Sequence, residues 1–201
     1  MRDTCRIFFR ALAAGIAIGI GGTVYLSLEN KIAGSLFFTV GLYVIVLNGL
    51  NLYTGKIGYL VEQKEAAPYI RMLALTWLGN LAGTILAASA VNAARISGIS
   101  INAAGLCEGK LSDSPASILI LAIFCGILMY AAVDGYKEKG NPLILFLCVS
   151  VFILSGFEHC IANMFYFTLA GAWSLKAFLY LLLMTLGNSL GGMLIPAVKK
   201  I

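Results

Sequence analysis

Charged residues are scarce in this chain: they make up 11% of its 201 residues, whereas hydrophobic residues make up 60%. Together with a mean hydropathy of +0.93, this scarcity excludes an ordinary soluble domain. The net charge of +5 does not indicate nucleic-acid binding, because the basic residues cluster at the ends of apolar runs. We therefore expect an all-α integral membrane protein, a single transmembrane domain over residues 1–201 surrounded by the lipid bilayer.

Histidine is nearly absent and metal-ligand patterns are missing. His159 is the only histidine, and the five cysteines show no metal-ligand spacing. One histidine cannot build a multi-histidine metal site, and no motif supplies the partners that a nucleophile–base pair needs. A membrane-embedded enzyme using His159, Glu158 and Cys160 is therefore the least favoured alternative, and the sequence implies no cofactor and no metal.

What the chain does contain is long apolar runs, and the distances between charged residues predict six membrane spans. A transmembrane helix needs roughly 20 apolar residues, and five runs come near that length. They are Ala11–Leu28, Ile32–Gly55, Met72–Ala94, Ser114–Val133 and Ala177–Val198. The remaining predicted span, the fifth in chain order, begins after Asn141-Pro142.

Lysine and arginine set the expected orientation. With the N-terminus inside, only Lys31, Arg95, Lys110 and Lys176 fall outside, and the other ten of the 14 basic residues fall on the cytoplasmic side. We therefore expect a multi-pass protein of the cytoplasmic (cell) membrane with both termini in the cytoplasm. The first run follows three arginines, as in a signal peptide, but it is long and no convincing cleavage site follows, so we expect a retained helix.

The fifth span carries a charged residue and the histidine near its middle. Uncharged residues occupy 141–157 and 160–175, and Glu158 and His159 lie between them. A charge at that depth is costly and normally faces protein or a watery path, and Gly156 permits backbone that a continuous helix does not use. We expect a broken helix on a permeation pathway. The alternative is a straight helix whose Glu-His pair holds helices together.

The two halves of the chain share short patterns. Asn80 and Asn188 both lie in Leu-Gly-Asn-x-x-Gly and are 108 positions apart, and residues 48–51 align with 155–158 at an offset of 107. With three spans in each half, the second copy must enter the membrane inverted. Inverted repeats with interrupted helices place the pathway at the repeat interface. The expected halves are about 1–96 and 112–201.

This repeat predicts a second interruption, in span two. Glycines, polar side chains and a hydroxyl group between residues 50 and 58 are typical of a loop that dips into the bilayer. We expect residues 50–58 and 155–160 to leave the helix on opposite sides of one pore. For span two, the alternative is a plain helix end followed by a cytoplasmic loop.

The segment Gly156-Phe157-Glu158-His159-Cys160-Ile161-Ala162-Asn163-Met164 resembles a motif of the formate–nitrite transporter family. Leu52-Tyr53-Thr54-Gly55 and Leu186-Gly187-Asn188-Ser189-Leu190-Gly191-Gly192 support this resemblance, which covers essentially the whole chain. It implies a homopentamer of aquaporin-like protomers, each with six helices in an inverted repeat and its own pore. It implies passage of small monovalent anions or their conjugate acids: formate first, then nitrite or hydrosulfide.

The resemblance also implies roles for individual residues. The substrate pathway would be formed by His159, Thr54, Asn188 and Lys110. The constriction would be formed by Leu52, Tyr53, Phe38, Leu42 and Phe152. The loops would be supported by Glu158, Asn51 and Asn163.

Each of these roles has a plainer alternative. Lys110 would concentrate anions at the outer mouth by electrostatic steering, or be an ordinary interfacial lysine. Thr54 and Asn188 would donate hydrogen bonds that replace part of the anion's hydration shell; alternatively, Thr54 caps a helix and Asn188 joins neighbouring helices. The apolar constriction residues would exclude water, or would simply pack between helices.

His159 would act through its protonation, which changes near neutral pH. The protonated ring would attract the anion and give a proton to it, which leaves a neutral species that crosses the apolar exit more easily; alternatively, His159 is only a polar contact. A carboxylate lining the pore would repel the substrate, so we expect Glu158 to fix the loop instead.

Two departures from the family pattern, and two rival functions, complete the expectations. Asn51 stands where many relatives carry glutamate, and the chain is expected to lack most of the N-terminal helix that relatives place on the cytoplasmic face. An aquaporin-like channel for small neutral solutes suits the inverted repeat, but the paired Asn-Pro-Ala loops are absent. A purely structural membrane scaffold would explain neither the glycine-marked interruptions nor the histidine.

Overall fold

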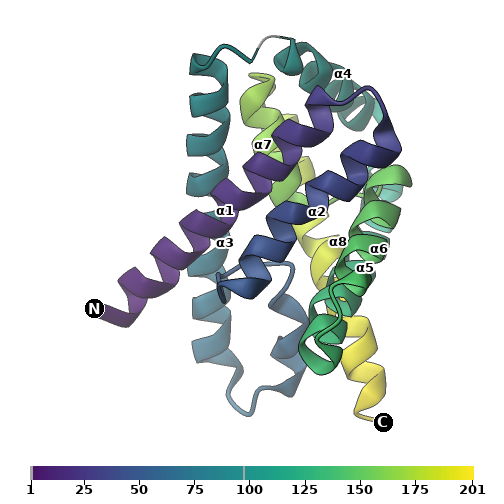
Figure 1. The fold of residues 1–201 in the computed structure, drawn as a ribbon. Helices are drawn as coiled ribbons and strands as arrows, with labels where there is room; N and C mark the ends of the chain where they lie inside the picture. Colours follow the sequence, from purple (N-terminus) through teal and green to yellow (C-terminus); the bar gives the residue numbers. More distant parts are fainter. Residues whose placement is uncertain (1, 97) are drawn as a thin grey trace.

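The computed structural model describes residues 2–96 and 98–201, and this part of the chain is helical (Figure 1). The side chain of Arg2, one of the arginines used above for orientation, lies outside the described part. The helices are α1 (Arg2–Ser27), α2 (Lys31–Leu47), the 3-10 helix η1 (Ile57–Glu62), α3 (Ala66–Ala93), α4 (Ile99–Ser112), α5 (Pro115–Lys139), α6 (Leu143–Leu154), α7 (Cys160–Leu169) and α8 (Leu175–Lys199).

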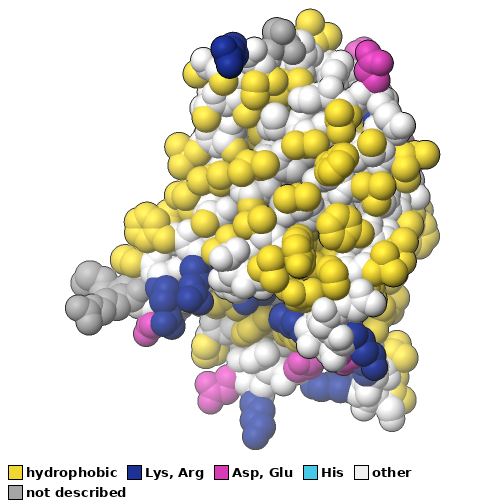
Figure 2. Space-filling model, in the orientation of Figure 1, with side chains coloured by type: hydrophobic (Ala, Val, Ile, Leu, Met, Phe, Trp, Pro, Cys, Tyr) yellow, Lys and Arg dark blue, Asp and Glu magenta, His cyan; other side chains and the backbone are white. Residues whose placement is uncertain are grey.

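Within the described part of the chain, four helices are long and apolar enough to cross a membrane. They are α1, α3, α5 and α8, with 25 to 28 residues each. Their outward side chains are largely apolar, and Figure 2 shows hydrophobic side chains over most of the visible face between its two ends. These four helices correspond to the first, third, fourth and sixth predicted spans.

The second and fifth predicted spans are built from shorter pieces. The second consists of α2, a non-helical segment at 48–56 and then η1. The fifth consists of α6, a non-helical segment at 155–159 and then α7. The backbone therefore leaves the α-helix in both predicted places, although Ile57 already begins the 3-10 helix and Cys160 already belongs to α7.

α2 and α6 end with the same backbone geometry. Gly49 has a φ of +60° and Gly156 a φ of +70°, a conformation that favours glycine. The following residue in each case donates its N–H five positions back, the bond of a Schellman cap. These bonds run from Leu50 N–H to the Ile45 carbonyl and from Phe157 N–H to the Phe152 carbonyl, both at 2.9 Å. The caps stop both helices inside their apolar runs.

The apolar runs of the sequence predict no helix between the third and fourth spans, yet α4 lies there. Its buried residues, Ile99, Ala103 and Cys107, recur every fourth position and form a single apolar face. This helix has 14 residues, too few to cross a membrane, and its apolar residues form no continuous run. A search for long uncharged stretches therefore overlooks it.

Glycines allow the long helices to approach closely in two pairs, α1 with α3 and α5 with α8. A Cβ atom on Gly83 of α3 would collide with the Leu12 carbonyl oxygen of α1. A Cβ atom on Gly191 of α8 would collide in the same way with the Ile123 carbonyl oxygen of α5. Small residues at such contacts let helix backbones meet inside a membrane.

We predict that Gly191→Ala lowers the stability by about 1–3 kcal/mol, because the obstructing atom is backbone and cannot rotate away. Gly109→Ala is the matched control, since a Cβ atom on this α4 glycine would meet nothing within 4 Å. Thermal unfolding of the detergent-solubilised protein measures the difference. Equal melting temperatures for the two variants would contradict the close α5–α8 approach.

Candidate functional site between the two interrupted helices

The two interruptions meet at a hydrogen bond between Thr54 and His159. The Thr54 Oγ1 and His159 Nε2 atoms are 2.8 Å apart, and the two residues are only 1% and 2% exposed. Thr54 follows the end of α2 and His159 precedes α7, so residues from the two halves of the chain form one buried polar contact. The sequence singled out both residues without indicating that they touch.

The second ring nitrogen of His159 caps α7. Nδ1 accepts a hydrogen bond from the Ala162 N–H at 3.0 Å, so it carries no proton in this arrangement. The proton of the neutral ring then lies on Nε2, which donates to Thr54 Oγ1. The Thr54 hydroxyl hydrogen is left to donate to another acceptor. A second ring proton, on Nδ1, would point at the Ala162 N–H, and the hydrogen bond that caps α7 would be lost.

Asn188, on α8, holds the interruption before α7. Its Nδ2 donates to the Ala122 carbonyl at 2.8 Å and to the Glu158 carbonyl at 2.7 Å. Its Oδ1 accepts from the Cys160 N–H at 2.9 Å. Both amide hydrogens are therefore used by backbone, in line with the alternative in which Asn188 joins neighbouring elements.

Asn80, on α3, holds the other interruption with the same set of bonds. Its Nδ2 donates to the carbonyls of Ala11 and Asn51, both at 2.8 Å, and its Oδ1 accepts from the Tyr53 N–H at 2.9 Å. Asn80 was absent from the predicted site residues. The pattern that it shares with Asn188 was the signal that could have identified it.

Asn51 itself ties its loop to the first helix. Its Nδ2 donates to the Ile7 carbonyl at 3.2 Å, and its backbone N–H donates to the Arg10 carbonyl at 3.3 Å. The corresponding backbone N–H of Glu158 donates to the Leu121 carbonyl of α5 at 3.3 Å. Each loop is therefore bonded to a long helix as well as to an asparagine.

Lys110 and Glu158 form a largely buried ion pair. Lys110 Nζ lies 2.6 Å from Glu158 Oε2, and the two side chains are 15% and 3% exposed. Asn163 Nδ2 donates to the same carboxylate oxygen at 2.8 Å and to the His159 carbonyl at 3.0 Å. The last turn of α4 thus brings a cation against the second interruption, a pairing that the sequence did not reveal.

The predicted constriction residues are mostly buried. The rings of Phe38 and Phe152 meet edge to face with centroids 6.2 Å apart, and Phe152 stacks on the His159 ring at 5.6 Å. Leu42 and Leu52 are also buried. Tyr53 is only half-buried, and its hydroxyl is 2.9 Å from Ser189 Oγ on α8.

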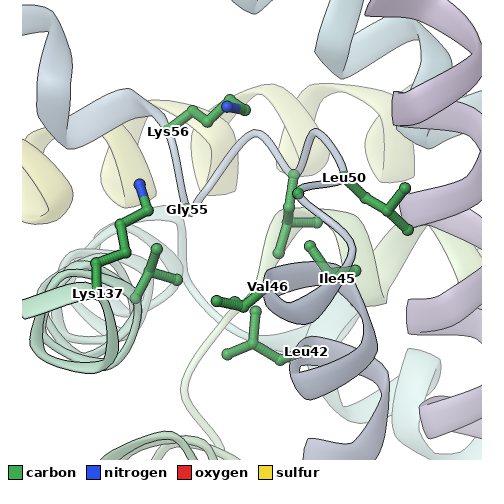
Figure 3. A pocket seen from close by; sticks show the side chains of 10 residues that line it. Leu42, Ile45, Val46, Leu50, Gly55, Lys56 and Lys137 are labelled. Atoms are coloured by element: carbon green, nitrogen blue, oxygen red, sulfur yellow. The ribbon is translucent and has the colours of Figure 1, made fainter. Parts of the chain in front are cut away.

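Two pockets approach this site. The first, here called the histidine pocket, is lined by residues that include Tyr25, Phe38, Lys110, Phe152, His159, Asn163 and Tyr166. The second, here called the lysine pocket, is lined by Leu42, Ile45, Val46, Gly49, Leu50, Leu52, Gly55, Lys56, Val133 and Lys137 (Figure 3). His159 borders the histidine pocket, whereas Leu52 and Gly55, on either side of Thr54, border the lysine pocket. The Thr54–His159 contact therefore lies between the two pockets.

Comparison with known proteins identifies the family. The family described as "Formate/nitrite transporter" matches residues 1–200. The chain belongs to this family. The known members of the formate/nitrite transporter family that it resembles are channels and transporters rather than enzymes. Family membership and the apolar helices together make the chain a multi-pass membrane protein.

Individual relatives are distant in sequence. The formate channel FocB of Escherichia coli (strain K12) is 26% identical over 193 residues, which cover 82% of this chain and 66% of that protein. The nitrite transporter NirC of Salmonella typhimurium is 28% identical over 204 residues, covering 89% and 76%. The chain thus spans just under two thirds of that formate channel.

Two solved structures share the fold. A pentameric formate channel with formate bound superposes with a TM-score of 0.87 at 25% identity and covers 99% of this chain and 96% of its own. A second family structure, an FNT family ion channel, has a TM-score of 0.85 at 22% identity, covering 99% and 94%. The all-helical fold found here is therefore that of the formate/nitrite transporter family.

We predict that Lys110→Met lowers the stability by about 3 kcal/mol or more, because it leaves the Glu158 carboxylate buried without a cation. Adding Glu158→Gln should recover part of this loss, since the double variant buries no unpaired charge. Lys64→Met, at an exposed lysine outside the ion pairs, is the control. Thermal unfolding of the single and double variants in detergent forms a double-mutant cycle; simple additivity would show that the pair is not coupled.

Proposed function

We propose that this chain is a channel or transporter for small monovalent anions or their conjugate acids, with formate first and nitrite or hydrosulfide next. The buried Thr54–His159 contact between two pockets is the observation that carries the proposal. There, hydrogen-bonding groups would replace part of the hydration shell that an ion loses on entry. The formate channels and nitrite transporters among the relatives support this substrate class.

We propose further that the fold is a six-span inverted repeat of halves 1–96 and 112–201, with the second and fifth spans interrupted. The matched Schellman caps and the matched bonds of Asn80 and Asn188 support this arrangement. So does the 3.1 Å hydrogen bond from Trp77 Nε1 to Thr185 Oγ1, because these residues occupy equivalent positions, 108 apart. Equivalent residues touch one another at a two-fold axis. The pentameric relative supports a homopentamer with one pore in each protomer.

In the proposed orientation, both termini and the lysine pocket face the cytoplasm, and the histidine pocket faces outward. The distribution of lysine and arginine supports this orientation. Figure 2 shows basic side chains gathered toward its lower end, the end at which α8 terminates in Figure 1. The membrane would be the cytoplasmic membrane.

An anion entering from outside would first meet Lys110 in the histidine pocket. The Lys110–Glu158 pair carries no net charge, so its electrostatic attraction is weaker than that of a free lysine. Phe38 and Phe152 would then exclude bulk water. Their rings have to turn aside for a solute to reach His159.

At the centre, Thr54 would donate its free hydroxyl hydrogen to the substrate. His159 would supply its Nε2–H, either directly or through Thr54. If His159 takes up a second proton, as the sequence analysis expects, the new N–H opposes the Ala162 N–H. Proton uptake would therefore weaken the first turn of α7. A change in the charge of His159 would in this way change the structure of the interruption before α7. Leu42 and Leu52 would form the apolar exit.

We expect purified protein in liposomes to pass formate, nitrite and hydrosulfide faster than acetate and lactate. A flux panel over these five solutes at two pH values is the direct test. Urea and glycerol serve as neutral probes for the alternative, an aquaporin-like channel. Passage of the neutral probes without the anions would favour that alternative, and passage of none would reject both.

We predict that His159→Asn alters the pH dependence or the anion selectivity of flux while the protein stays folded. Asparagine is a good helix N-cap, so the α7 cap should survive, while loss of the buried bond to Thr54 should lower the stability by about 1–3 kcal/mol. The titratable ring and its Nε2–H are lost. Formate and hydrosulfide flux from about pH 5 to 8 brackets an unperturbed histidine. Flux equal to the parent at every pH, in a normally assembled variant, would make His159 a structural residue.

A further inference from the structure

The short helix η1, which follows Thr54, fits tightly between α5 and α8. Gly58 belongs to η1 and comes four positions after Thr54. A Cβ atom on Gly58 would collide with the Tyr130 ring of α5 and with the Gly192 carbonyl oxygen of α8. The chain that leaves the site therefore passes through a narrow gap between these two long helices.

Thr54 and η1 are joined by a short hydrogen-bonded turn. The Tyr53 carbonyl accepts from the Lys56 N–H at 3.0 Å and from the Ile57 N–H at 2.9 Å. At the start of the turn, Asn80 Oδ1 accepts from the Tyr53 N–H at 2.9 Å. Since Thr54 lies inside this turn, a shift of η1 would move the Thr54 hydroxyl as well.

Asp134 of α5 joins η1 to α8. The Tyr59 hydroxyl of η1 donates to Asp134 Oδ1 at 3.1 Å, and Lys199 Nζ of α8 donates to Asp134 Oδ2 at 3.0 Å. The Tyr59 oxygen also accepts from Lys137 Nζ at 3.1 Å, so its own hydrogen is directed to the carboxylate. The Asp134 side chain is only 14% exposed, which strengthens its hydrogen bonds relative to those at an open surface. One carboxylate thus connects three elements.

η1 is held by less packing than the corresponding element of the second half. Tyr59 and Tyr166 are 107 positions apart, the offset between the two interruptions, so η1 corresponds to α7. α7 has ten residues, nine of them buried, whereas η1 has six, of which only Ile57 and Gly58 are buried. The position of η1 therefore depends more on its side-chain hydrogen bonds than the position of α7 does.

We propose that Asp134 and Tyr59 are positioning residues for Thr54: they hold η1 in place and so keep the Thr54 hydroxyl 2.8 Å from His159 Nε2. The inference rests on the proposed function, in which this contact receives the substrate. Neither Asp134 nor Tyr59 lines the histidine pocket or the lysine pocket, so both act through η1 and not by contact with a solute. Without the bond between them, η1 can shift and the Thr54–His159 bond lengthens.

The first test observes this bond directly and needs no transport. His159 is the only histidine, so isotope labelling of histidine nitrogen, in protein purified without a histidine tag, reports a single ring by nuclear magnetic resonance. The spectra are recorded at about pH 8, where an unperturbed histidine is neutral. Thr54→Val, which removes the hydroxyl, gives the signal of the Nε2 proton without its partner. Tyr59→Phe and Asp134→Ala should each move this proton upfield, part of the way to that position, because a longer hydrogen bond deshields the proton less.

Glu138→Gln is the matched control for these two variants. Glu138 also lies on α5 and faces the same Lys199, at 3.6 Å, and its replacement leaves Asp134 and Tyr59 in place. The His159 signal of this variant should stay at the parent position. A signal that is unchanged in Tyr59→Phe and Asp134→Ala, or that moves equally in Glu138→Gln, would overturn the proposal.

Flux then shows whether the positioning matters for transport. Tyr59→Phe should lower formate flux roughly three- to tenfold, the effect of about one hydrogen bond, and should cause no further loss in a Thr54→Val background. A general loss of stability would instead lower flux by the same factor in both backgrounds. A displaced His159 signal with parental flux would reject a role in the pathway. If the parent passes no anion, the proposed function fails, and the His159 signal still decides whether Asp134 and Tyr59 hold the contact.

Discussion

Backbone that leaves a helix inside a membrane must find partners for its N–H and C=O groups, because lipid offers none. The structure meets this constraint twice with one side chain each time. Asn80 satisfies two carbonyls and one N–H of its half, and Asn188 does the same in the other. Without these amides, both interruptions would leave buried polar groups unpaired. The positions of Thr54 and His159 depend on them.

The same constraint explains why a carboxylate can lie beside the second interruption. The backbone of Glu158 is bonded to Asn188 and to α5, and its carboxylate is bonded to Lys110 and Asn163. A buried charge is tolerated when it is paired and hydrogen-bonded. Glu158 therefore joins the loop to α4, which explains how a short helix outside the long spans contributes to the centre of the protein.

The sequence predicted the structure well where a residue type, or the length of an apolar run, has a single structural role. Gly49 and Gly156 mark the ends of α2 and α6, since few other residues adopt their backbone angles, and uncharged run lengths located the four long helices. The sequence did not predict contacts that depend on a second residue. The Lys110–Glu158 pair joins residues 48 positions apart, and the bonds of the His159 ring depend on how α7 begins. α4 was missed because one buried residue in four gives no long apolar run.

The asparagine bonds also bear on how the protein can move. Each interruption is tied to a long helix, and the long helices meet at glycines that leave no room to slide. Sliding one half past the other would break several buried hydrogen bonds at once, whereas turning the rings of Phe38 and Phe152 breaks none. The backbone of the two interruptions is therefore held rigidly, whereas the side chains of Phe38 and Phe152 can rotate. If the two rings close the pathway as proposed, the time a solute waits there would be set by rotamer changes, which are faster than collective motions of domains.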